Sequence, residues 1–97
     1  MLTHANTRVV LVGTTATAVV PSNPNRIGFI LENKGNNIVH VSFGEDPSLS
    51  NGIQLIRGTG RLELWEYRCG TAVKDEMRAI SEGLSSSVSV TEFVLTP

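Results

Sequence analysis

Apolar and polar residues alternate along most of this chain, and this alternation limits its fold more than any other feature. In the segment from residue 26 to 32, Ile27, Phe29 and Leu31 fall on the side that we expect to face a core. The other side carries Arg26, Gly28, Ile30 and Glu32. A period of two is the repeat of a β-strand with one buried face, and helical periodicity is almost absent. The pattern predicts an all-β protein.

The same alternation marks two strands near the beginning of the chain and one after the turn at residues 33–37. Residues 7–12 and 15–20 read as strands, with Gly13 between them and Pro21 closing the pair, so we expect an N-terminal hairpin. Residues 38–43 form a further strand whose inward row is Val39, Val41 and Phe43.

Short strands continue to the end of the chain. We expect one near residues 53–56 and another over 61–67, where Leu62 and Leu64 point inward and Trp65 lies opposite, at a sheet edge or in an interface. About eight short strands with Gly-rich turns predict a small antiparallel β-sandwich, jelly-roll-like in its connections.

Two segments depart from simple alternation. Residues 71–82 carry apolar residues at both helical and strand spacing, and we favour a strand over residues 78–81. In the last strand Val88 and Val90 are on one phase, whereas Phe93 and Leu95 continue on the other. This change predicts a bulge near Thr91 and Glu92, or a strand that leaves one sheet to pack on another.

Length and charge limit the partners. A chain of 97 residues fits one domain, 1–97, in which residues 1–7 form an extended N-terminal arm. The net charge is −1 with scattered cations, which argues against direct binding of nucleic acid. Its longest apolar run, residues 9–12, is far too short for a membrane span, and no signal peptide is expected. Cys69 is the only cysteine, which favours folding inside a cell.

No constellation for chemistry stands out. His40 has no second histidine at metal-ligand spacing, and nothing places Cys69 beside it as a thiol and base pair. Glu45 and Asp46 lack the other acidic positions of a calcium loop, and the glycines of residues 57–60 precede a strand rather than a helix. We therefore expect no enzyme activity, no cofactor and no metal, and a protein that binds or builds.

The candidate contact residues lie in three places. Trp65, Tyr67 and Arg68 belong to the residue types enriched at binding hot spots, although Trp65 could equally cover the end of the core. The other candidates are Leu2 and His4 in the arm, and Leu49, the only bulky apolar residue of the loop 44–52.

The order of these features resembles small virion proteins of tailed bacteriophages. The resemblance rests on Asn23-Pro-Asn-Arg26 leading into the strand 27–33, on Val39-His-Val-Ser-Phe-Gly44, and on Asn51-Gly-Ile-Gln-Leu55 followed by Gly58-Thr-Gly60. It covers about residues 8–93, and its motifs are turns and strand ends. In the penultimate strand of the family, residues 71–73 and 79–81 match, but residues 74–78 interrupt them.

The resemblance implies a structural role without enzyme activity. Such proteins decorate and stabilise capsids as cement proteins, or occur as head-fibre and tail components. It implies a homo-oligomer that contacts other virion proteins, above all the major capsid protein, in a phage particle assembled in the host cytoplasm. The alternative is a fibre component that binds a carbohydrate receptor, with Trp65 and Tyr67 stacking on sugar rings.

Overall fold

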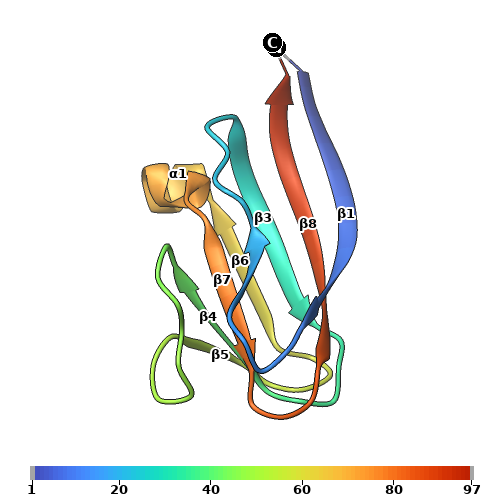
Figure 1. The fold of residues 1–97 in the computed structure, drawn as a ribbon. Coiled ribbons are helices and arrows are strands. Elements are labelled where there is room, and N and C mark those ends of the chain that lie inside the picture. Colours follow the sequence, from blue (N-terminus) through green and yellow to red (C-terminus); the bar gives the residue numbers. More distant parts are fainter. Residues whose placement is uncertain (1, 97) are drawn as a thin grey trace.

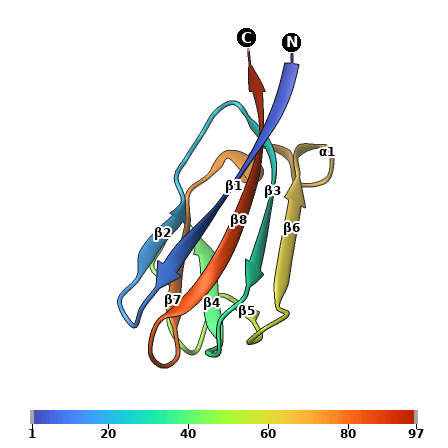
Figure 2. The ribbon, with the colours of Figure 1, turned by 90° about the vertical axis from the view of Figure 1, so that its right-hand side faces the viewer.

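The computed structural model describes residues 2–96 as two antiparallel four-stranded sheets packed face to face (Figures 1 and 2). Sheet A has the order β1-β8-β3-β6, with bounds Leu2–Val12, Ser86–Thr96, Arg26–Asn33 and Arg61–Trp65. Sheet B has the order β2-β7-β4-β5, with bounds Thr17–Val20, Met77–Ser81, Val39–Phe43 and Ile53–Leu55. This strand order is that of a jelly roll, so the predicted fold class is confirmed.

The predicted N-terminal hairpin is wrong. β1 and β2 belong to different sheets, and the chain crosses from one sheet to the other over residues 13–16. β1 instead pairs along its whole length with β8, from Leu2 opposite Thr96 to Val12 opposite Ser86. Consecutive strands pair in most folds, but a jelly roll joins the first strand to the last. Residues 2–7 of the predicted arm are extended and form the first part of β1.

The core lies between the two sheets and is built from the inward rows of the strands. Its fully buried side chains include Phe29 and Leu31 of β3 and Val39 and Val41 of β4, as the alternation predicts. Leu62, Leu64 and Phe43 pack against this core and are partly buried. The remaining core residues are Val12, Val19, Val20, Leu55, Val73, Met77, Ala79, Val88 and Val90.

The ambiguous segment 71–82 divides into a helical part and a strand. A short helix α1, Glu66–Cys69, is followed by a 3-10 turn η1, Gly70–Lys74, and then by β7. The strand predicted over residues 78–81 is confirmed, since it lies inside β7. Val73 is the buried residue of η1 and connects this segment to the core.

The phase change in the last strand does not mark a bulge, so that prediction is wrong. β8 pairs with β1 in one unbroken register, and the irregularity lies across from it in β3, between Arg26 and Gly28. It turns Arg26 inward, where the side chain is fully buried, whereas alternation placed Arg26 on the outside. Along β8 the alternation of buried and less buried positions continues without a break, with Glu92 in the inward row and Phe93 in the outward row. The phase change in the sequence therefore reflects a polar residue in the inward row.

β1 and β8 are the longest strands, with 11 residues each, and they reach past sheet B at one end of the molecule (Figures 1 and 2). The strands of sheet B have at most 5 residues. The molecule is therefore elongated, 42 × 21 × 19 Å, and both ends of the described chain lie side by side at its tip.

Candidate protein-binding surface

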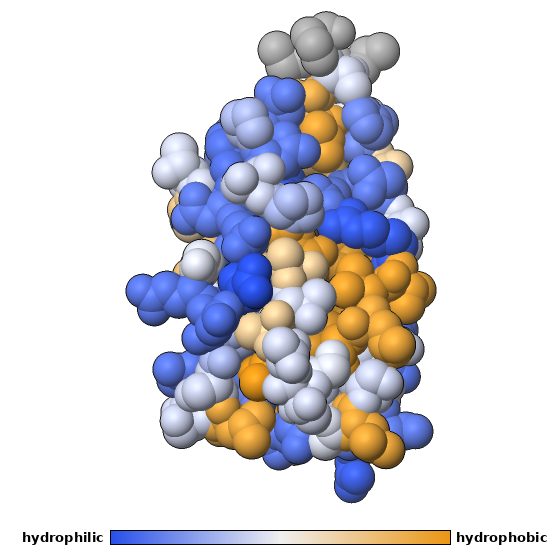
Figure 3. Space-filling model, viewed as in Figure 1, coloured by the Kyte–Doolittle hydropathy of each residue, from blue (hydrophilic) through white to orange (hydrophobic). Residues whose placement is uncertain are grey.

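The solvent-facing side of sheet A, called here the outer face of sheet A, carries large apolar side chains. Val9 and Leu11 on β1 are 69% and 63% exposed, and Ile30 and Trp65 on β3 and β6 are half-buried. In Figure 3 an apolar area lies midway along the side of the molecule on which β1 lies in Figure 1. Strand alternation and register assign to this face Thr3, Ala5, Thr7, Val9, Leu11, Ser87, Ser89, Thr91, Phe93, Leu95, Gly28, Ile30, Glu32, Arg61, Glu63 and Trp65.

An aromatic pair lies at one end of this face. The rings of Trp65 and Phe93 have centroids 4.8 Å apart and planes inclined by 40°, a favourable tilted contact. Gly28 lies between their strands, opposite both residues. A Cβ atom at Gly28 would stand 2.2 Å from Cε3 of Trp65, so only glycine leaves room for the indole. Trp65 lies on an edge strand, as one of the two sequence interpretations expected.

An ion cluster with two buried members, Arg26 and Glu92, lies on the inner side of the same end. Glu92 accepts from Arg8 Nη1 at 2.5 Å and from Arg26 Nη1 at 3.2 Å. Arg26 also donates to the backbone carbonyls of Val73, Pro21 and Asp75, each at 2.7 Å. Burial lowers the pKa of Arg26, and the hydrogen bond and charge of Glu92 oppose that shift. The cluster ties the loop before β3 and the segment after α1 to sheet A.

Sequence reasoning missed this cluster. Its only signal in the sequence was the phase change in the last strand. If the alternation is continued past that point, Glu92 falls in the same inward row as Val88 and Val90. Beside the cluster lies a cleft of about 520 Å³ between the overhanging part of β1 and the chain around β2. Its lining is His4, Asn6, Arg8, Val10, Ala18, Val19, Pro21, Asn23, Glu92 and Val94.

The outer side of sheet B is polar. His40 was predicted to face solvent or an interface, but it is buried, and its Nε2 lies 2.6 Å from Oε2 of Glu82. This contact gives the buried ring a polar partner. Arg78 donates to Asp46 at 2.5 Å, a contact that raises the pKa of Arg78.

The six predicted contact residues are not gathered into one site. His4 lines the cleft, and Leu49, 55% exposed, lies in the loop 44–52, away from the paired chain ends (Figure 1). Tyr67, 79% exposed, and Arg68 lie on α1, where the guanidinium carbon is 5.8 Å from the tyrosine ring centre. Leu2 begins β1, but its side chain lies outside the part that the structure describes.

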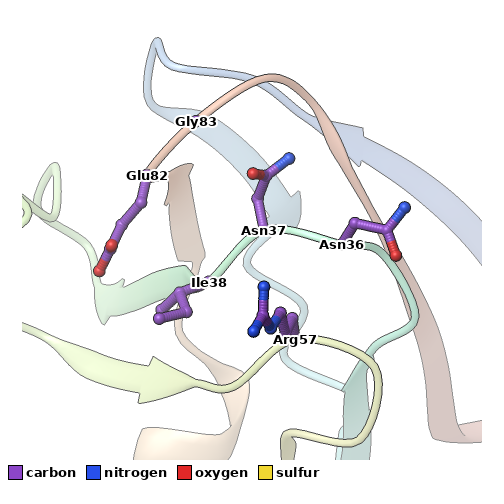
Figure 4. A pocket seen from close by; sticks show the side chains of 6 residues that line it. All are labelled: Asn36, Asn37, Ile38, Arg57, Glu82 and Gly83. Atoms are coloured by element: carbon purple, nitrogen blue, oxygen red, sulfur yellow. The ribbon is translucent and has the colours of Figure 1, made fainter.

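A second hollow, of about 420 Å³, lies where three loops meet (Figure 4). Its lining is Asn36, Asn37, Ile38, Arg57, Glu82 and Gly83, a mixed and open polar surface. Within residues 2–96, no three His, Cys, Asp or Glu side chains are grouped as metal ligands would be. None of the helices in that range is long and apolar enough to span a bilayer.

These features define a small jelly-roll β-sandwich in which the outer face of one sheet exposes large apolar side chains. Comparison of the sequence with protein-family models and with curated proteins found no match. Among solved structures, the fold is similar to a Bacillus protein described under the words "Bacillus endospore appendages form a novel family of disulfide-linked pili". The TM-score is 0.59 at 11% sequence identity, over 99% of this chain and 88% of that one. At this level of sequence identity, the likeness shows a shared fold alone.

Proposed function

We propose that this chain is a structural subunit of a bacteriophage virion, which decorates and stabilises the capsid through repeated protein–protein contacts. The outer face of sheet A makes the contact, and the partner is another virion protein, in the first place the major capsid protein. The proposal assigns no chemical step to the chain. It places the protein in the phage particle, after synthesis in the host cytoplasm.

The observation that carries the proposal is that the outer side of sheet A exposes large apolar side chains among its polar ones, in addition to the apolar core on its inner side. Its inner side forms the core with Phe29, Leu31 and Val90, and its outer side shows Val9 and Leu11 to solvent. An antiparallel sheet with one face in water normally alternates apolar with polar residues. Contiguous exposed apolar surface on a soluble domain marks a place where a partner binds, and aromatic residues such as Trp65 are enriched there.

Two further findings support a role in assembly. The turn and strand-end motifs of the sequence resemble those of small virion proteins. The fold is similar to that of a protein described as forming disulfide-linked pili. That pilus is described as disulfide-linked, whereas Cys69 is the single cysteine here and could join at most two copies. Repeated non-covalent contacts, each weak alone, would therefore have to hold this subunit in place.

The test is binding of the purified chain to particles of the phage whose genome encodes it, measured by co-sedimentation. The variant Ile30→Lys places a charge in the middle of the outer face of sheet A, between Thr91 and Glu63. The matched control Gln54→Lys places the same charge on an exposed position of β5 in sheet B. We expect a loss of binding for Ile30→Lys alone. If the unaltered chain fails to bind both whole and stripped particles, the proposal is overturned.

A fibre component that binds a carbohydrate receptor is the second candidate, because Tyr67 is largely exposed and Trp65 is half-buried on the surface. Aromatic rings at a surface can stack on sugars. A glycan array separates the two functions: binding that Trp65→Ala abolishes would favour the receptor role, and an array without signal would remove it.

A further inference from the structure

We infer that β1 pairs with β1 of a second copy of this chain, so that two molecules form one continuous antiparallel sheet. The inference rests on the proposed function in one respect, that this protein acts as part of an assembly. It adds the first contact of that assembly, which is a contact between two identical subunits. It uses the edge of sheet A, whereas capsid binding uses the outer face.

The free edge of β1 is long. β1 is an outer strand of sheet A, and in residues 2–96 its backbone ladder runs to β8 alone. The Ser87 carbonyl accepts from Lys34, and the Leu95 amide donates to Asn25, so odd-numbered residues of β8 point toward β3. Even-numbered residues of β8 therefore bond β1, through its own even-numbered residues. The odd-numbered residues of β1 direct their N–H and C=O groups to solvent: Thr3, Ala5, Thr7, Val9 and Leu11.

The other sheet edges offer much less. β6 has 5 residues and carries Arg61 and Glu63, and β2 and β5 have 4 and 3 residues. Proteins normally protect a long edge strand with lysine, proline, a bulge, an unpaired inward-pointing charge or a covering loop. β1 has neither lysine nor proline, and its register with β8 shows no bulge. Its one charged side chain, Arg8, is held by Glu92 and the Val19 carbonyl.

One register satisfies the whole edge. When two copies of β1 are paired about a two-fold axis at Thr7, Val9 lies opposite Ala5 and Leu11 opposite Thr3 of the other copy. Each of these residues points its backbone groups at the partner, so every N–H and C=O of the free edge is bonded. On the inner side Arg8 lies opposite Asn6, so no like charges meet. A two-fold pairing of identical surfaces is the commonest form of homodimer.

The experiment measures self-association of the full chain by analytical ultracentrifugation over a range of concentrations. Thr7→Pro removes the N–H at the two-fold axis while leaving the ladder to β8 intact, and proline is tolerated on an edge strand. Thr7→Ala is the matched control, because both variants lose the 3.0 Å hydroxyl contact with Thr91 but alanine keeps the amide. We expect Thr7→Pro to raise the dimer dissociation constant at least about tenfold over Thr7→Ala.

Hydrogen exchange of the unaltered chain gives a second measurement that does not depend on the folding of a variant. The amides of Ala5, Thr7 and Val9 should become protected as the concentration rises, whereas those of Asn6 and Arg8 are protected throughout. A chain that stays monomeric at high concentration, or edge amides that exchange freely in the dimer, would overturn the inference. A monomer that still binds phage particles through the outer face would overturn it and leave the proposed function standing.

Discussion

The two ends of sheet A are built in opposite ways. At the end that sheet B covers, the inner side carries Val12, Val88 and Leu31, all fully buried. Toward the overhanging end, at the margin of sheet B, the inner side carries charges, with Glu92 between Arg8 and Arg26. The large apolar rings of that end, Trp65 and Phe93, lie on the outer side.

The difference shows that the polarity of the side chains on a sheet face depends on the kind of structure that packs against that face. At the covered end another sheet supplies apolar side chains, so valine and leucine fill the space between. At the overhanging end the cover is a loop and η1, which present backbone carbonyls that need donors. Arg26 meets that need at Val73, Pro21 and Asp75, and Glu92 then compensates its charge. A buried charge of this kind is stable only when it is paired and hydrogen-bonded.

The largest effect should come from removing Glu92. Glu92→Ala leaves Arg26 buried without its hydrogen-bonded counter-charge, and breaking one partner of a buried pair costs about 3–5 kcal/mol in the free energy of unfolding. The measurement is chemical denaturation followed by circular dichroism. The control is Glu63→Ala, which removes a carboxylate from an exposed pair with Arg61 and should cost at most about 1 kcal/mol. Equal losses for both variants would show that the overhanging end is not held by its ion cluster.

The sequence predicted the covered end well and the overhanging end poorly. Alternation identified Phe29, Leu31, Val39 and Val41 as core residues, because a strand between two sheets sorts its side chains by hydrophobicity alone. The same rule failed for Arg26, because its burial depends on carbonyls of Pro21 and Val73 that only the folded chain brings together.

The pairing of strands was equally hard to predict. Alternation says which side of a strand is buried but does not say which strand lies beside it, so β1 was assigned to its neighbour in sequence and not to β8. For the candidate surface, Trp65 could be placed opposite the core from its phase. Its contact with Phe93 could not be placed, because it depends on the register of three strands around Gly28.

A smaller effect is expected from a methyl group at Gly28, which tests the outer side of the overhanging end. Gly28→Ala forces the indole of Trp65 to move, and overpacking of this kind costs about 1–3 kcal/mol in the free energy of unfolding. Trp65 is the only tryptophan, so its fluorescence reports the movement directly as a shift to longer wavelength. Gly13→Ala is the control, since a Cβ atom there meets nothing within 4 Å. An unchanged spectrum and stability would mean that the aromatic pair does not depend on the glycine.

The smallest effect on the isolated molecule should come from Leu11, on the outer side of the covered end. Leu11 is 63% exposed, so Leu11→Ser should change the free energy of unfolding by no more than about 0.5 kcal/mol in dilute solution. Leu31→Ala, on the inner side of the same end, should cost about 2–5 kcal/mol. If β1 pairs with a second copy, the cost of Leu11→Ser must grow with protein concentration, because association stabilises only the folded chain. Thermal unfolding at several concentrations measures this dependence, and a large cost in dilute solution would mean that Leu11 supports the fold of the single chain.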